Sequence, residues 1–347
     1  MSRFKFVAVL LALALCFSPM VSYEANASQD ELLMLKIGTG FPGGLWFPAS
    51  AVLAAEIERA LGAIGINASA SIQSTPGVFN VAAVNEGNEM QLTITTSQNQ
   101  YLAYHGLPPF TQRMENIRLI GTQELMLTQI VVPAASNINS LADLRDRTIN
   151  IGRPATTNRI MIEALLRSYG LTFDDIRASG GQTMELTWDD ATTMMQDGHM
   201  DCIITYGGIM PSIVNLVFQP GVRFLSISEE AKERIFADPT MMGFVPAVIQ
   251  AGVYEGQDYE VRTVAVQTTI LANKNLSDDV VYAITRAIYE SGYHVAIFGP
   301  TMAQGWPRVC NPEDLPKVAN IPVHPGALRY FESIGIAIPG QLEIPAQ

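Results

Sequence analysis

Glycines and small hydroxyl residues follow several apolar segments of the sequence, and these residue types suit the binding of an anion. The first group, Gly38 to Pro48, reads GTGFPGGLWFP and has the spacing G-x-G-x-x-G. Four later segments have the same character: QSTPG at 73–77, TTSQN at 95–99, RPATTN at 153–158 and TYGG at 205–208. Backbone N–H groups and hydroxyls in such loops can bind a carboxylate or phosphate, particularly where a helix begins.

The glycine spacing also fits a dinucleotide site, but the surrounding residues argue against one. A dinucleotide fold places an acidic residue about twenty positions later, at the end of the second strand. The corresponding segment ends at Ser74 without an acid. Pro42, Trp46 and Phe47 also replace the small residues needed where a helix packs against a pyrophosphate. We therefore expect no nucleotide cofactor.

Apolar strands that alternate with amphipathic helices must position these loops. The pattern predicts strands at 32–38, 66–72, 91–99, 147–152 and 202–208 and helices at 49–61, 78–85, 159–170 and 187–196. Such alternation is typical of parallel sheets covered by helices on both faces. Two copies of the plan predict an α/β chain with two lobes. Loops at the carboxyl ends of parallel strands would line a ligand cleft between them.

The later part of the chain has a different pattern. It predicts helices at 229–238, 278–297 and 324–335 and an extended region at 244–273. We expect part of the extended region to cross between the lobes as a hinge, with the last helices packed on the first lobe.

The N-terminus has the three parts of a secretory signal peptide. Arg3 and Lys5 precede an uncharged apolar run at 6–17, and Ala25-Asn26-Ala27 gives an A-x-A cleavage site. We therefore expect export to the periplasm, with cleavage near Ala27. The predicted organisation is 1–27 signal peptide, 28–125 with about 256–347 first lobe, and 126–255 second lobe.

Charge and cysteine content narrow the class of protein. Loss of Arg3, Lys5 and Glu24 removes one net positive charge, which changes the formal charge from −12 to −13. So acidic a chain is expected to bind nucleic acid and anionic membranes poorly.

Cys202 and Cys310 remain after processing, and a chain of this length can form a large core without disulfides. We expect two buried free thiols.

Four segments resemble the signatures of one protein family in order and spacing. They are GTGFPGGLWFP, QSTPGVFN, YEGQDYEVRTV at 254–264 and HPGALRYF at 324–331. They resemble the TAXI class of TRAP-transporter solute-binding proteins over essentially the whole mature chain. The resemblance implies a two-lobed periplasmic-binding-protein-like fold that closes on a small organic anion and delivers it to a TRAP membrane permease. Characterised members are associated with glutamate or related dicarboxylates.

The resemblance and the loop pattern together give a candidate ligand-binding set. It consists of Thr39, Gly40, Gly43, Gly44, Trp46, Ser74, Thr75, Thr96, Ser97, Arg153, Thr156, Thr157, Asn158, Tyr206 and Gly207. The match is uneven. The family's usual Ala-Asp pair is Glu89-Met90 here, and its G-A-P-G-S-G-T-like loop is the segment 152–158, GRPATTN. These departures leave the ligand's identity open among dicarboxylates, 2-oxo acids and acidic amino acids.

Several of these residues have a structural interpretation beside the functional one. Arg153 either pairs with a ligand carboxylate or is a solvated loop residue, and a surface role is the commoner one for Arg159. Trp46 can form a pocket wall, whereas Phe47 is expected in the core. The Tyr206 hydroxyl can face the cleft or belong to the core. Residues 156–158 can cap a helix and contact the ligand at once.

The sequence offers no catalytic or metal-binding constellation. His105, His199, His294 and His324 are scattered without the spacing of metal ligands, and His324 is expected to be structural. Asp189-Asp190 begins a predicted helix, where acids are favourable. We expect a monomeric receptor rather than an enzyme. The alternatives are a receptor for an ABC transporter or two-component sensor, and an exported enzyme that uses the same cleft.

Overall fold

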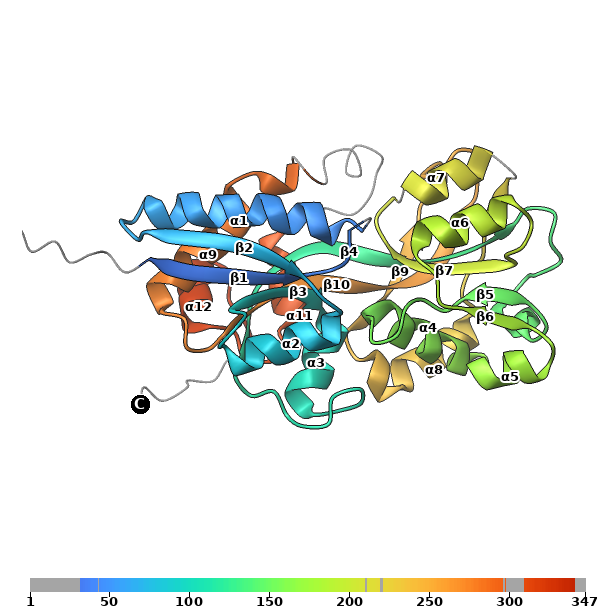
Figure 1. Cartoon of the computed structure of the whole chain (residues 1–347), viewed down its shortest axis with the longest axis horizontal. Coiled ribbons are helices and arrows are strands. Elements are labelled where there is room, and N and C mark those ends of the chain that lie inside the picture. Colours follow the sequence, from blue (N-terminus) through green and yellow to red (C-terminus); the bar gives the residue numbers. More distant parts are fainter. Residues whose placement is uncertain are drawn as a thin grey trace, which may run out of the picture. The chain divides into compact units, whose positions relative to one another are not determined.

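The computed structural model describes residues 32–42, 44–209, 211–218, 221–295, 297 and 309–340. The predicted signal peptide lies outside this part of the chain. Helices flank a ten-stranded sheet whose main strand order is β2-β1-β3-β10-β4-β7-β5-β6, and β8 and β9 pair with β4 and β10 (Figure 1). The described residues belong to one compact unit that begins at Leu32.

The first α/β group matches the predicted alternation closely. Its elements are β1 (Leu33–Thr39), α1 (Trp46–Gly62), β2 (Ala68–Ser74), α2 (Gly77–Glu86), β3 (Leu92–Thr96) and α3 (Ser97–His105). Strand β1 pairs in parallel with β2 and β3. Helix α1 forms because Leu53, Ile57 and Leu61 recur every fourth residue and bury one face. The TTSQN segment differs from its prediction: the strand ends at Thr96, whose hydroxyl caps α3.

The second α/β group repeats this plan with shorter strands. Its elements are β5 (Thr148–Asn150), α4 (Thr157–Ser168), α5 (Phe173–Ala178), β6 (Gln182–Met184), α6 (Trp188–Gln196), β7 (Cys202–Gly207), α7 (Pro211–Phe218), β8 (Val222–Phe224), α8 (Glu229–Ala237) and β9 (Phe244–Ile249). Strand β5 pairs in parallel with β6 and β7. Several of these helices begin at a threonine or serine that accepts a backbone N–H, as in α4, α6 and α8.

Two long strands connect the groups (Figure 1). Strand β4 (Ile117–Pro133) pairs with β10 over its first part and with β7 from Leu127 onward, always antiparallel. Strand β10 (Val261–Asn273) pairs with β9, β4 and β3. The β4–β10 register shifts between Gln267 and Thr269. There the Gln267 amide donates to the carbonyl oxygens of Gln123 and Glu124, at 3.1 and 3.2 Å.

The apolar cores follow the two groups. One core draws its buried residues from 35–120 and 270–331, and two others draw theirs from 127–266. Helices α9 (Asp278–Glu290) and α12 (Pro325–Ser333) contribute to the first core, as the sequence predicts, and the short helix α11 (Leu315–Val318), which was not predicted, also contributes. Helix α9 ends before the predicted position 297, because Gly292 adopts a left-handed φ of 76°.

Cys202 and Cys310 are buried and unpaired, which confirms the prediction of two free thiols. Within the described ranges, no helix has the length and apolar character needed to cross a membrane. Nor do His, Cys, Asp and Glu side chains gather there in any group that could hold a metal ion.

Candidate ligand-binding cavity

A cavity of about 630 Å³ lies where the loops of the two α/β groups meet. The glycine loop after β1 and the loop after β2 line it from the first group. The loops after β5, β6 and β7 line it from the second group, and β4 contributes Glu124 and Met126. Parallel strands carry their connecting loops to one edge of a sheet, and binding sites in such folds form at that edge.

Five helices begin at this cavity, namely α1, α2, α4, α6 and α7. The first N–H groups of a helix lack partners within it and carry partial positive charge. In α4 and α6 the hydroxyls of Thr156 and Thr187 accept one of these N–H groups. Among the described residues, no side chain caps α1 after Leu45 or α2 after Pro76. The starts of α1 and α2 therefore have amides free to bind an anion.

Three side chains that line the cavity have buried polar atoms that form no well-aligned hydrogen bond in the described part of the chain. They are the Oε2 atom of Glu124, the hydroxyl of Tyr206 and both amide atoms of Asn158. The hydroxyls of Thr268 and Thr128 are polar neighbours of Glu124 and Tyr206, respectively. A buried polar group without a partner costs about 1–3 kcal/mol, so folded proteins rarely retain one. Atoms of this kind also occur outside the cavity in the described chain, and these three side chains are the ones placed where a bound molecule could pair with them.

Glu124 is the charged residue that sequence reasoning missed. It lies in β4 and is only 2% exposed. The indole Nε1 of Trp46 donates to its Oε1 at 2.9 Å. Burial raises the pKa of the Glu124 carboxyl, against the opposing effect of hydrogen bonds that include the one from Trp46. The available signal was a single acid inside a long apolar segment, since a lone buried carboxyl is rare without a function.

Arg153 lies at the exposed side of the cavity, on the loop after β5. Its guanidinium lies 5.4 Å from the ring centroid of Phe41, a residue of the glycine loop. The cation therefore contacts the loop on the opposite wall. Arg159 differs, because it pairs with Glu185 and packs on Phe173 outside the cavity lining.

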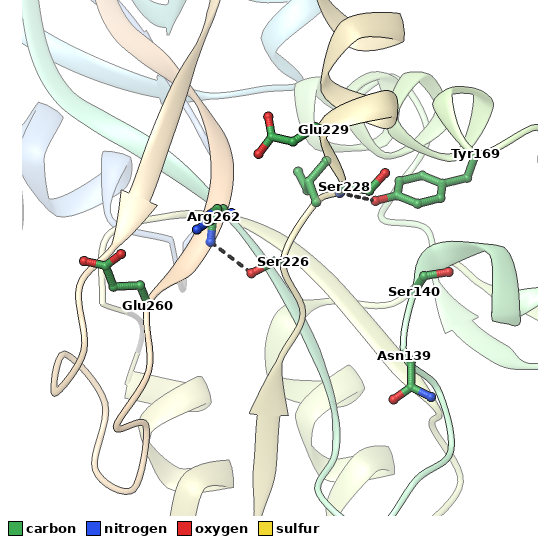
Figure 2. Close-up of a pocket in the computed structure, with 9 residues that line it drawn as sticks. Asn139, Ser140, Tyr169, Ser226, Ser228, Glu229, Glu260 and Arg262 are labelled. Carbon is green, nitrogen blue, oxygen red and sulfur yellow. Dashed lines mark hydrogen bonds between the residues drawn. The ribbon is translucent and has the colours of Figure 1, made fainter.

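A second pocket, of about 400 Å³, lies at the start of α8 (Figure 2). The Tyr169 hydroxyl accepts from the backbone N–H of Ser228 there, and the Ser226 hydroxyl accepts from the N–H of Arg262, both at 3.0 Å. These polar groups hold the connection between β8 and α8 in place. None of the predicted ligand residues lines this pocket, so we place the candidate site in the larger cavity.

The amino-acid sequence matches the NMT1-like family over residues 37–335. The chain belongs to the NMT1-like family. Its structure is similar to XAC2383 from Xanthomonas citri bound to chloride ion, with a TM-score of 0.51 at 11% identity over 87% of this chain and 99% of that one. It is also similar to the periplasmic binding protein BugD, with a TM-score of 0.51 at 14% identity over 88% and 98%. These similarities confirm the predicted two-lobed periplasmic-binding-protein fold.

In this NMT1-like chain the cavity brings together nine of the predicted ligand residues. They are Gly40, Gly44, Trp46, Thr75, Arg153, Thr156, Asn158, Tyr206 and Gly207. Gly43 lies outside the described residues, and so does the side chain of Thr157. The lining also includes residues that the sequence analysis did not assign to it, among them Glu124, Leu186, Trp188 and Ser212.

Four predicted residues do not line the cavity, because their hydroxyls bind the backbone. The Thr39 hydroxyl donates to the Trp46 carbonyl at 3.0 Å, and that of Ser74 donates to the Gly40 carbonyl at 3.0 Å. The Ser97 hydroxyl donates to the carbonyl of Gly243, and that of Thr96 caps α3. These residues shape the loops that carry the cavity. Phe47 also differs from expectation: it is partly exposed and belongs to neither the core nor the cavity lining.

Proposed function

We propose that this NMT1-like protein is an extracytoplasmic receptor that captures a small organic anion and delivers it to a TRAP-type membrane permease. Dicarboxylates, 2-oxo acids and acidic amino acids are the ligand classes. The observation that carries the proposal is the convergence of five helix starts on a cavity whose lining includes three polar side chains with atoms that form no well-aligned hydrogen bond in the described chain. A volume of about 630 Å³ falls in the range of small-molecule sites.

Charge in the cavity also favours an anion. Arg153 has its guanidinium at the lining, and the uncapped starts of α1 and α2 add partial positive charge. An arginine suits a carboxylate, because its planar fork can form two parallel hydrogen bonds. The lining also contains two acidic residues, Asp189 at the start of α6 and the buried Glu124.

Capture would follow from closure of the two lobes. We place the first lobe at 28–125 with about 256–347, and the second at 126–255. The distribution of buried residues among the cores supports this division, except that 261–266 of β10 pack with the second lobe. The point at which the chain returns from the second lobe to the first therefore falls inside β10. A ligand that touches both lobes favours closure, because it binds the closed state better than the open one.

The signatures of the TAXI resemblance fall into two kinds. The first two form the cavity loops, whereas the last two serve the fold. In the third, the buried Gln257 amide donates to the Gln250 carbonyl at 3.1 Å. In the fourth, the buried His324 Nδ1 accepts the Gly326 N–H at 3.2 Å and begins α12. The cavity loops are accordingly the part in which ligand preference can vary.

A thermal-shift and calorimetric screen tests the receptor function. The mature protein is refolded to remove any ligand that copurifies and is titrated with succinate, 2-oxoglutarate, L-glutamate and neutral controls. A ligand at a hundred times its dissociation constant adds about 2.7 kcal/mol of stability. Selective stabilisation by one anion class supports the proposal. Stabilisation by neutral compounds alone, or by none of the panel, contradicts it.

The permease partner needs a separate test. TRAP membrane subunits are reconstituted in proteoliposomes, and a sodium gradient across the membrane drives transport. The anion identified in the screen is added outside, with or without this protein. Uptake that depends on this protein supports delivery to a TRAP permease. Uptake only through an ABC transporter reconstituted in parallel would assign the receptor to the other transporter class.

A further inference from the structure

A carboxyl group in an anion-binding cavity requires an explanation, because an ionised Glu124 would repel the ligand. We propose that Glu124 binds as a neutral carboxylic acid and donates a hydrogen bond from Oε2 to an oxygen of the anion. Glu124 is then a specificity-determining residue. The inference rests on the proposed receptor function and identifies one of the groups that read the ligand.

The hydrogen bond from Trp46 determines which oxygen of Glu124 carries the proton. Oε1 accepts from the indole Nε1 at 2.9 Å, so a proton on Oε1 would compete with this donor. Oε2 is buried and forms no well-aligned hydrogen bond in the described part of the chain, where the hydroxyl of Thr268 is a polar neighbour of the carboxyl. A neutral carboxyl therefore places its O–H on Oε2, where it is available as a donor. A carboxylate oxygen of the ligand can accept a hydrogen bond from this O–H group.

The groups around Glu124 favour the neutral form. Burial raises its pKa. The ionisable or polar side chains near it, or in the same lining, are Trp46, Arg153, Asp189, Tyr206, Thr268, Tyr293 and Cys310. Burial also raises the pKa values of Tyr206, Tyr293 and Cys310, so these three groups are neutral and supply no counter-charge. No lysine or arginine of the described chain pairs with Glu124; Arg153 lies at the exposed side.

The backbone around Glu124 is held by hydrogen bonds from β10. It lies at the register shift between β4 and β10, where the Gln267 amide binds the carbonyl oxygens of Gln123 and Glu124. Bulges of this kind commonly orient a side chain beside a functional site. The indole therefore restrains Oε1, and the bonds from Gln267 restrain the backbone that carries the carboxyl.

Glu124→Gln and Glu124→Leu separate the neutral acid from an ionised one. Glutamine retains an acceptor for Trp46 and an N–H donor at the position of Oε2, whereas leucine keeps the size and removes both. We expect Glu124→Gln to bind within about threefold of wild type and Glu124→Leu to lose tenfold or more. Affinities are measured by calorimetry at pH 7 with succinate, 2-oxoglutarate and L-glutamate. Circular dichroism establishes that both variants fold, and the glutamine variant carries the test if the leucine variant does not.

The pH dependence gives an independent readout that a structural role would not change. Between pH 6 and 9, wild-type affinity should stay constant or fall relative to Glu124→Gln, because binding needs the proton on Oε2. Loss of binding in Glu124→Gln, with wild-type affinity that rises with pH, overturns the inference and assigns a carboxylate that holds a cationic group of the ligand. Failure of wild type to bind any of the three anions instead overturns the receptor function itself.

Discussion

The indole of Trp46 and the carboxyl of Glu124 are joined by a hydrogen bond of 2.9 Å between residues 78 positions apart in sequence. Trp46 begins α1, and its carbonyl accepts the Thr39 hydroxyl at 3.0 Å from the end of β1. The glycine loop is therefore held at both ends and tied to β4. One aromatic side chain connects the best-matched sequence signature to a carboxyl that the signature does not contain.

Trp46→Phe tests this link. The substitution removes the N–H donor that stabilises ionised Glu124, so the pKa of Glu124 should rise further. The orientation of the carboxyl is also lost, and anion affinity should fall about fivefold, the worth of one hydrogen bond of about 1 kcal/mol. Calorimetry against 2-oxoglutarate measures the change. Phe47→Leu is the control, since Phe47 belongs to neither core nor cavity lining. An equal loss in both variants would contradict the role given to the indole.

Arg153→Ala should weaken anion binding by about 10- to 100-fold, because hydrogen bonds to charged groups contribute about 1.5–3 kcal/mol. The thermal midpoint of the ligand-free protein should change little, since the side chain is exposed. Arg159→Ala is the matched control: its partner Glu185 and the Phe173 ring lie outside the cavity lining. Similar losses in the two variants, measured by calorimetry, would show that general charge and not the Arg153 position governs affinity.

Gly152→Ala should lower both stability and affinity. Gly152 has a φ of 71°, and a Cβ added there would lie 2.8 Å from Nδ2 of Asn158. The strained backbone should cost about 1–2 kcal/mol, and displacement of Asn158 should weaken binding. Gly170→Ala is the matched control. Gly170 has nearly the same φ, 70°, and a Cβ added there would have open space around it. We expect it to lose similar stability in chemical denaturation and to keep full affinity; a parallel loss of affinity would contradict the role of Asn158.

His324 should make the protein less stable in acid. Burial lowers its pKa in the folded state, while the nearby Asp278 opposes the shift. The unfolded chain therefore binds the proton more readily, and stability is lost as pH falls through the unfolded value of about 6.5. His324→Asn retains a capping side chain without this titration. Its thermal midpoint should fall less steeply than that of wild type from pH 7.5 to 5.5, and equal slopes would exclude His324 as the source.

The Glu124 carboxyl also affects how stability depends on pH, and its effect is opposite in sign to that of His324. A pKa raised by folding stabilises the protein at low pH, and this contribution is lost as pH rises through the folded value. Wild type and His324→Asn both contain Glu124, so the difference between their curves isolates the histidine.

Sequence patterns predicted most of the elements of both α/β groups but missed the long central strand β4. Helix α1 and strand β1 follow from regular spacing of apolar residues, which a local pattern can report. Strand β4 escaped prediction because Thr122, Gln123 and Glu124 interrupt its apolar sequence in the middle. Those polar residues are tolerated there through contacts with β10 and α1, which are distant in sequence.

The candidate site shows the same division. Sequence identified the loops, because glycine and hydroxyl clusters mark the ends of strands. It could not distinguish a hydroxyl that faces the cavity from one that binds the backbone, as Thr39 and Ser74 do. That distinction depends on the rotation of single side chains. Tyr206, for which both interpretations were open, belongs to a buried core and to the cavity lining, and the hydroxyl of Thr128 is its polar neighbour.

The crossing of β4 and β10 gives this arrangement a directional consequence. Both strands contribute to the cores on either side, and Glu124 is carried where their ladder is interrupted. If the lobes separate about this point, water reaches the carboxyl and its desolvation is relieved, so its pKa falls. Opening would therefore shift the protonation equilibrium of Glu124 towards the ionised form, so the movement of the lobes and the charge of the binding site are coupled.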